Sequence, residues 1–338
     1  MRAILVREPG GPEVLSVGEA PEPVQGAGEL LVQVRAAGLN RADLLQRMGR
    51  YPPPPGESEL LGLEVAGGVL AVGQGCVGRG PGGRSYQVGD RVMALLAGGG
   101  YAERARVPAA QALPIPNGLS FTEAAAVPEA FLTAYLNLVH IGRLAPGEAV
   151  IIHAAASGVG TAGLQLCRGV ASVVLATASA GKLASLQRHG ATHLLPREQV
   201  PNGWALAEAV RAAAGRGADL IFDLVGGSYL EPNVAALGLH GRLCCIATAG
   251  GAKGTLDLGA LLGKRLSVFG STLRTRSAEQ KARLCEKFAA EVLPRFSAGA
   301  SAPLQPVVAR VFAFEEVRGA HEVLEANEVV GKVVLELR

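Results

Sequence analysis

Residues 149–168, AVIIHAAASGVGTAGLQLCR, lead from an apolar stretch through a glycine-rich turn into a helical pattern. Gly158, Gly160 and Gly163 follow the order G-x-G-x-x-G. In a strand-to-helix turn, the first two glycines let the backbone approach a pyrophosphate, and the third lets the helix pack on the strand. The free N–H groups and dipole of the helix start favour negative charge. This setting predicts a dinucleotide site rather than a mere tight turn.

Short apolar stretches alternate with helical patterns from about residue 121 onward. Such alternation builds a parallel sheet wound with crossover helices. The amphipathic pattern of 278–296 predicts a helix that stops at Pro294, and the end of the chain reads as a helix and then a strand that returns to the first domain. The expected strands of this part are 149–155, 172–178, 218–225, 241–247 and 266–273.

The first 120 residues instead read as strands separated by turns rich in proline and glycine. The expected strands are 29–38, 63–73 and 90–98. Four glycines and one proline in the segment 78–87, GRGPGGRSYQ, leave little apolar area to hold it down, so we expect a mobile surface loop there. The chain has 338 residues, enough for two domains at about 150 residues each.

Composition excludes several classes of protein. With 49% hydrophobic and 18% charged residues, the chain is not of the disordered type. A net charge of +3 is too mild to indicate binding to nucleic acid or to an anionic membrane. Nucleic acid is therefore not expected as a partner, and the basic residues of 274–283 are expected on a solvated face. These are Arg274, Arg276, Lys281 and Arg283.

Targeting signals and metal motifs are not evident. Glycine, histidine, serine or charge interrupts every long apolar stretch, which predicts no membrane span. Arg7 and Glu8 follow the short apolar start, so we expect a cytoplasmic protein without a secretory signal. The five cysteines form no C-x-x-C pair, and Cys244 and Cys245 point to opposite faces of an expected strand. We therefore expect no metal site.

The end of the second strand of the wound sheet indicates which coenzyme binds. NAD-binding proteins usually carry an acidic residue there for the ribose 2′-hydroxyl. This chain has ATASAGK instead, with Ser179 and Lys182, and Arg197 follows the next short strand. Hydroxyl and cationic groups suit a 2′-phosphate, which favours NADP. Solvated side chains are the alternative interpretation of Lys182 and Arg197.

Six motifs in order resemble the quinone oxidoreductase subfamily of the medium-chain dehydrogenases/reductases, above all its tumour-suppressor-inducible branch. They are GLNRAD, RYPPPPG, PEAFLTAY, HAAASGVGTAGLQL, DLVGG and VGKVVLEL. The resemblance implies an α/β fold, in which a GroES-like β-rich catalytic domain accompanies a doubly wound Rossmann domain. It places the first part of the catalytic domain at 1–124, the NADP-binding domain at 125–272 and the return segment at 273–338.

Site residues are also implied by the resemblance. Asn40 and Tyr51 would line the nicotinamide and substrate cleft. From the residues themselves, Asn40 fixes a carbonyl group or stabilises its own loop, and Tyr51 donates a hydrogen bond or only packs. In the family pattern, the pyrophosphate is held by Ser157, Gly158, Val159 and Gly160, and the 2′-phosphate by Ser179 and Lys182. Thr133 would bond the nicotinamide amide, and the residues that flank the nicotinamide half would be Val225, Thr248, Phe269 and Ser271. Asn327 and Lys332 would close the site from the C-terminal strand.

The zinc alcohol dehydrogenases of the same superfamily bind a catalytic zinc through a cysteine and a histidine. The corresponding positions here are Asn40 in GLNRAD and Leu63 in GLEVAG, so the resemblance implies chemistry without zinc. Arg197 stands where the subfamily commonly has tyrosine, which strengthens the expectation of NADP. Ser179 stands where it usually has glycine. Asp223 is expected to cap backbone rather than to act in catalysis.

The expected activity is NADPH-dependent reduction of a small quinone by hydride transfer. The alternatives are a metal-free enoyl or alkenal reductase and, in another class, a non-enzymatic NADPH-binding structural or RNA-associated protein. The apolar segment 266–273 would be an unpaired edge strand in a monomer, so we expect a homodimer or a higher homo-oligomer.

Overall fold

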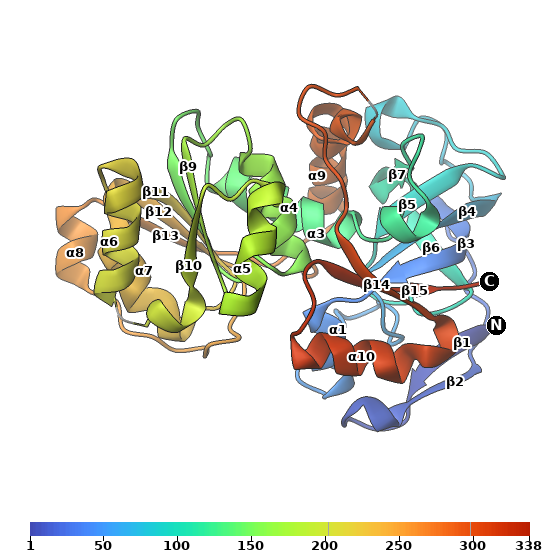
Figure 1. The fold of residues 1–338 in the computed structure, drawn as a ribbon. Helices are drawn as coiled ribbons and strands as arrows, with labels where there is room; N and C mark the ends of the chain where they lie inside the picture. Colours follow the sequence, from blue (N-terminus) through green and yellow to red (C-terminus); the bar gives the residue numbers. More distant parts are fainter. Residues whose placement is uncertain (202, 298) are drawn as a thin grey trace. The chain divides into compact units, whose positions relative to one another are not determined.

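The computed structural model describes residues 1–201, 203–297 and 299–338. The chain is divided into two compact units. The first unit consists of Met1–Leu132 together with Leu273–Arg338, and the second unit consists of Thr133–Thr272. The second unit is thus inserted in the sequence of the first (Figure 1). The fold is that of a GroES-like β-rich part and a Rossmann-type parallel sheet, as the sequence predicted.

The first unit is built on a seven-stranded sheet and a separate two-stranded sheet. The strand order is β14-β15-β3-β4-β5-β7, with β6 beside β3, while β1 pairs with β2. The strands are β1 (Arg2–Val6), β2 (Leu15–Glu19), β3 (Glu29–Gly38), β4 (Glu64–Val72), β5 (Arg91–Leu95), β6 (Arg104–Pro108), β7 (Ala112–Pro114), β14 (Val308–Ala313) and β15 (Lys332–Glu336).

The last strand of the chain returns to this sheet, which confirms the prediction. β15 pairs antiparallel with β3, with Val334 opposite Gly38. β14 lies parallel to β15 on the outer side. The sequence did not predict β14, because its side chains are partly or fully exposed along its whole length and lack the apolar run of a buried strand.

Helices complete the first unit, and α10 packs against the last two strands. Its apolar core combines residues of the sheet with residues of α10, such as Leu30, Val65, Val333 and Val317. The expected amphipathic helix before Pro294 is α9. The helices that begin in this unit are α1 (Arg41–Arg47), α2 (Phe121–Ala124), α3 (Pro128–Tyr135), α9 (Ala278–Glu291) and α10 (Val317–Ala326).

The second unit is a six-stranded sheet in the order β10-β9-β8-β11-β12-β13, and every pairing in it is parallel. Parallel neighbours need crossover connections, and the helices between the strands supply them. The strands are β8 (Ala149–Ile152), β9 (Val173–Ala178), β10 (His193–Pro196), β11 (Ala218–Asp223), β12 (Leu237–Cys245) and β13 (Ser267–Gly270). The helices are α4 (Gly158–Cys167), α5 (Ala180–Leu186), α6 (Gly203–Ala214), α7 (Leu230–Ala236) and α8 (Leu258–Gly263).

Strand β13 forms one edge of this sheet, as expected for the segment 266–273. Its apolar side chains Val268 and Phe269 are 38% and 39% exposed. Leu258 and Leu262 of α8, which precedes β13 in the chain, are more exposed still. An edge strand with exposed apolar side chains is a template for pairing with another strand. Pairing of β13 with a second copy of the chain would cover these side chains, which is the self-association that the sequence predicts.

The loop at 78–87 is mostly exposed, as expected of a surface loop, and contacts of its buried residues and of Gly82 anchor it to the rest of the first unit. Pro81 and Tyr86 are buried, and the Tyr86 hydroxyl donates to the carbonyl of Ala112. The backbone N–H of Gly82 donates to Glu286 of α9 at 2.8 Å. The buried ring of Tyr86 and the hydrogen bond to Glu286 therefore stabilise a segment whose glycines have no side chains to pack.

One helical stretch, Phe121–Ile141, is long and apolar enough to cross a membrane by length and composition alone. Glu123, Glu129 and His140 interrupt this stretch, as expected, but they do not lower its mean hydropathy enough to exclude a membrane span by composition. In the structure 78% of its most apolar window is buried inside the protein. Burial of that kind is typical of a core helix.

Candidate active site

The glycine-rich turn of the second unit links β8 to α4. Ser157 caps the helix, because its Oγ accepts a hydrogen bond from the backbone N–H of Gly160 at 3.0 Å. A Cβ atom at Gly160 would lie 2.5 Å from the carbonyl oxygen of Ala154, so the turn tolerates no side chain there. Gly158 and Val159 begin the helix, where N–H groups lack partners within the helix. The turn has the form of a pyrophosphate cradle.

The groups expected at a 2′-phosphate follow the next two strands. Ser179 is the N-cap residue of α5, directly after β9, and its side chain makes no capping hydrogen bond. Lys182 lies in the first turn of the same helix and is partly buried. Arg197 comes directly after β10, with half of its side chain exposed, and its Nε pairs with Glu198 at 3.1 Å. β9 and β10 are neighbours in the parallel sheet, so all three residues follow the same edge.

Thr133 carries an orphaned polar atom at the start of the second unit. Its Oγ1 is buried and has no hydrogen-bond partner among the described residues. Its carbonyl accepts from Asn137 Nδ2 at 2.9 Å, and Asn137 Oδ1 accepts from the Ser271 hydroxyl at 2.6 Å. Asn137 thus ties two residues predicted for the nicotinamide half into one network. A buried hydroxyl without a partner suits a ligand amide.

Asp223 ends β11 and caps the next turn, as predicted. Its Oδ1 accepts from the backbone N–H groups of Val225 and Gly226 at 2.7 and 3.1 Å. Its Oδ2 accepts from Asn233, and Asn233 Oδ1 lies 2.7 Å from the ring of His153. Burial lowers the pKa of His153, so the ring is neutral. This network fixes the turn that carries Val225.

The remaining predicted residues of this unit lie at or after the carboxyl ends of the strands. Thr248 follows β12, is exposed, and accepts a hydrogen bond from Gly251 at 2.9 Å through its carbonyl. Phe269 lies on β13, which is parallel to β12. In doubly wound sheets this end of the strands is where ligands bind. Val225, Thr248, Phe269 and Ser271 therefore lie at that end of the sheet.

In the first unit, Asn40, Glu64 and Lys332 form a buried cluster. The Nζ of Lys332 lies 2.6 Å from Oε1 of Glu64 and donates to Oδ1 of Asn40 at 2.7 Å. The Nδ2 of Asn40 donates to Oε1 of Glu64 at 2.9 Å. Lys332 and Glu64 are 5% and 0% exposed. Both ends of the Asn40 amide are therefore held by charged neighbours.

Asp43 supports this cluster from α1. Its carboxylate accepts from the backbone N–H groups of Asn40 and Gly62 at 2.7 and 3.1 Å, and from the Tyr101 hydroxyl at 3.3 Å. Complete burial raises the pKa of Asp43 to about 6, although the two backbone hydrogen bonds oppose the shift. Asp43 thus fixes the loop that presents Asn40.

Tyr51 lies beneath a buried arginine. The guanidinium of Arg274 is 5.2 Å from the centre of the Tyr51 ring, and its Nη1 donates to the Tyr51 carbonyl at 3.2 Å. Arg274 also donates to Gln46 and to the carbonyl of Ala97 at 2.6 and 2.8 Å. Burial raises the pKa of the Tyr51 phenol, so it remains a neutral hydrogen-bond donor.

The solvated face expected for the basic residues of 274–283 was partly wrong. Arg274 and Lys281 are 3% and 5% exposed. Burial lowers the pKa of Lys281, which the charges of Glu57 and Glu129 raise again. Arg283 is exposed and pairs with Glu279 on its own helix, as a solvated residue does. The sequence did not show which of these cations had partners from distant segments.

Asn327 ends helix α10 in a left-handed conformation, with φ of 58°. Asparagine adopts this conformation more readily than most residues. Its Oδ1 accepts from Arg41 at 3.4 Å. Asn327 therefore marks the turn that leads to β15 and Lys332.

The sequence missed Glu64, Asp43 and Glu129 as members of this cluster. Each is an acidic residue within an apolar or helical segment, as in LEVAG and PEAFL. A carboxylate in a strand that is otherwise apolar is costly to bury without a partner. That cost is a signal that could have indicated a buried site at Glu64.

The donor atoms of the cluster do not fit a zinc ion. Oε1 of Glu64 and Oδ1 of Asn40 both accept from the ammonium of Lys332, which fills the space between them with a cation of the chain itself. Within the described ranges, no three His, Cys, Asp or Glu residues are grouped as metal ligands are. Zinc normally binds three or four such ligands.

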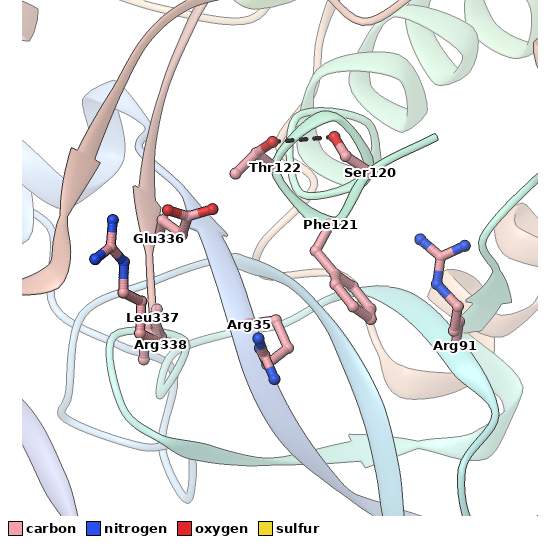
Figure 2. A pocket seen from close by; sticks show the side chains of 8 residues that line it. All are labelled: Arg35, Arg91, Ser120, Phe121, Thr122, Glu336, Leu337 and Arg338. Atoms are coloured by element: carbon pink, nitrogen blue, oxygen red, sulfur yellow. Dashed lines mark hydrogen bonds between the residues drawn. The ribbon is translucent and has the colours of Figure 1, made fainter. Parts of the chain in front are cut away.

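A separate cavity of about 410 Å³ lies on the first unit. Figure 2 shows Phe121 between Arg35 and Arg91, whose guanidinium carbons are 6.0 and 4.7 Å from the ring centre. None of the predicted coenzyme or substrate residues lines this cavity. Its lining consists of Arg35, Arg91, Ser120, Phe121, Thr122, Glu336, Leu337 and Arg338.

Comparison with known families matches both parts of the chain. The alcohol dehydrogenase GroES-like domain matches residues 26–117, and the zinc-binding dehydrogenase family matches residues 189–335. A curated quinone oxidoreductase of Lama guanicoe is 31% identical over 100% of this chain and 98% of its own length. The human synaptic vesicle membrane protein VAT-1 homolog is 31% identical over 99% of this chain and 86% of its own length.

Solved structures agree with this assignment. The mycobacterial protein Rv1454c, determined in complex with NADPH, is 30% identical, covers 100% of both chains and has a TM-score of 0.86. The CurK enoyl reductase is 27% identical over 100% of this chain and 99% of its own, with a TM-score of 0.83. From its motifs, its two-part fold and these relatives, the chain belongs to the zinc-free, quinone oxidoreductase-like branch of the medium-chain dehydrogenase/reductase family.

Proposed function

We propose that the chain is an NADPH-dependent quinone reductase that acts by hydride transfer and without a metal. The observation that carries this proposal is the bonded cluster of Lys332, Glu64 and Asn40. It gives the catalytic unit a fixed amide and a buried cation in place of a metal-ligand set. Quinone reduction suits such a unit, because positioning of the acceptor supplies most of the catalysis.

The second unit would hold the coenzyme. The turn at Ser157–Gly160 binds the pyrophosphate, and the unpartnered Oγ1 of Thr133 bonds the nicotinamide amide. Ser179, Lys182 and Arg197 bind the 2′-phosphate, since no carboxylate of residues 179–182 repels it. Bound NADPH would supply the hydride. Val225, Thr248, Phe269 and Ser271 flank the nicotinamide half.

The first unit would position the acceptor. The Tyr51 hydroxyl donates to a quinone carbonyl, and Arg274 holds the Tyr51 ring in place. Asn40 stays in one orientation because Lys332 and Glu64 hold both ends of its amide. Asn327 and Lys332 complete the site from the C-terminal segment.

Parallel assays test this function. NADPH or NADH is mixed with the chain and with ortho-quinones, para-quinones, 2-alkenals or enoyl thioesters, and loss of the reduced coenzyme is followed. We expect turnover with quinones and a preference for NADPH. Turnover confined to alkenals or thioesters would replace this proposal with its alternative, an enoyl or alkenal reductase, which the likeness to CurK favours.

Coenzyme binding without turnover of any acceptor would instead indicate a non-enzymatic NADPH-binding protein. The resemblance to relatives that carry the quinone oxidoreductase name argues for an enzyme. We further propose a cytoplasmic homodimer. Its support is the exposed apolar edge strand β13, which a second copy would cover.

A further inference from the structure

Glu129 has a buried carboxyl oxygen without a partner. It lies in the first turn of α3, and its Oε2 receives no hydrogen bond from any residue in the described part of the chain. Its backbone N–H donates to Oε2 of Glu64 at 2.8 Å. That bond fixes Glu129 beside the cluster of Lys332, Glu64 and Asn40. A buried polar atom without a partner costs about 1–3 kcal/mol and calls for an explanation.

Glu64 and Glu129 differ in the hydrogen-bond donors that reach their carboxyl oxygens. Glu64 accepts from Lys332, Asn40 and the N–H of Glu129. No described residue donates a hydrogen bond to Oε2 of Glu129. Burial and then the charge of Glu64 raise the pKa of Glu129 to about 8. At neutral pH, Glu129 therefore keeps its proton, and its buried Oε2 has no hydrogen-bond partner among the described residues.

Four charged side chains, from four different elements, act on the pKa of Glu129. Glu64 on β4 and Asp43 on α1 favour its protonated form, while Lys332 on β15 and Lys281 on α9 favour its charged form. The charge of Glu129 also contributes to the pKa values of Tyr51 and of Arg274, whose guanidinium lies over the Tyr51 ring. Glu129 thus shares its surroundings with the residue predicted to contact the substrate. The two lysines make its charged form accessible after it loses a proton.

We propose that Glu129 is the proton donor of the reaction, giving its carboxyl proton to the substrate oxygen that becomes negative. This inference rests on the proposed function. Hydride brings two electrons and one hydrogen to the quinone and leaves an oxyanion. The O–H bond of Glu129 then breaks, its electron pair stays on the carboxylate, and a new O–H bond forms on the substrate. Water returns a proton to Glu129.

Substitution by glutamine separates this role from a structural one. Glu129→Gln keeps the side-chain size and the backbone bond to Glu64, but it cannot give up a proton. For the wild type we expect kcat to fall as the pH rises through about 8, because the acid form of Glu129 is lost. For Glu129→Gln we expect kcat about 100-fold lower and without that fall. Glu129→Asp, which keeps an acid, should recover part of the rate.

Glu57→Gln is the matched control, since Glu57 is an exposed carboxylate that also faces Lys281. It should keep the wild-type rate and pH profile. Coenzyme affinity, measured by fluorescence of bound NADPH, should be the same in all four proteins. A Glu129→Gln variant with the wild-type rate and pH profile overturns the role of Glu129.

Infrared spectroscopy separates failure of this inference from failure of the proposed function. In D2O without coenzyme, the wild type should show a protonated-carboxyl band at neutral pH that disappears through about pH 8 and is missing in Glu129→Gln. Absence of that band overturns the inference whatever the substrate. A band together with no quinone turnover overturns only the proposed function, and the enoyl and alkenal acceptors then serve for the rate comparison.

Discussion

The Nζ atom of Lys332 lies 2.6 Å from Oε1 of Glu64, and both side chains are almost fully removed from solvent. We predict that Lys332→Met lowers the free energy of unfolding by about 3–5 kcal/mol, because a buried carboxylate loses its cation. Chemical denaturation followed by circular dichroism measures the loss. Lys287→Met removes an exposed lysine of α9 and should change stability by less than about 0.5 kcal/mol.

The double variant Lys332→Met with Glu64→Leu should recover most of that stability, because it removes both charges together. It should not recover activity, since the Asn40 amide then has no fixed orientation. If Lys332→Met unfolds at the same denaturant concentration as the wild type, the pair contributes nothing and this explanation is wrong.

His321 makes the first unit sensitive to acid. Arg47 donates to its Nδ1 at 3.2 Å, and its Nε2 is buried without a partner among the described residues. Burial and then Arg47 lower the pKa of His321 from 6.5 to about 3. The unfolded chain takes up this proton below pH 6.5 and the folded chain does not. Stability should therefore fall with pH from about 6.5 to about 3, by up to about 1.4 kcal/mol per unit.

Asp43 acts in the opposite sense over part of this range. Burial raises its pKa from 3.8 to about 6, so the folded chain keeps a proton that the unfolded chain releases, and stability rises as pH falls from about 6 to 3.8. His321→Gln isolates the histidine, because Asp43 is then unchanged. The variant should lose stability less steeply on acidification than the wild type. Equal slopes of unfolding free energy against pH would contradict the assignment.

Coenzyme preference depends on Lys182. We predict that Lys182→Ala weakens NADPH binding about 10-fold or more, as expected for loss of a charged hydrogen bond worth about 1.5–3 kcal/mol. The affinity for NADH should not change, because NADH lacks the 2′-phosphate. Fluorescence titration gives both dissociation constants. Equal wild-type affinities for the two coenzymes would refute the NADP assignment.

Self-association through β13 should respond to charge on that edge. Val268→Lys places a cation on an apolar strand edge, where it disfavours pairing with a second copy. We expect a dimer for the wild type and a monomer for the variant by light scattering. Trp204→Lys is the control, since it removes a side chain that is 72% exposed on α6, a helix outside that edge. A monomeric wild type would contradict the proposal.

Local sequence patterns predicted most of the fold. The alternation of apolar strands and helices after residue 120 predicted the parallel sheet. Gly160 shows why the turn needs glycine, since a Cβ atom there would clash with the backbone of Ala154 and Ala155. Both signals depend on residues close together in the chain. Strand β14 was not predicted, because its side chains are partly or fully exposed and form no apolar pattern.

The polar cluster of the first unit was harder to predict, because its members meet only in the folded chain. Glu64 and Lys332 are separated by most of the sequence, and Arg274 is buried by contacts with residues 46, 51 and 97. The sequence identified Asn40, Tyr51 and Lys332 only through the family resemblance. It could not show that Glu129 would be left with an unpartnered oxygen.

The position of Lys332 on the last strand has a consequence for the order in which the chain matures during synthesis. The second unit is one continuous segment, so all of its strands are available once residue 272 has been made. The first unit begins earlier but lacks β14, β15 and the counter-charge of Glu64 until residues 308–336 have been made. The first unit is therefore the one whose synthesis begins first and is completed last.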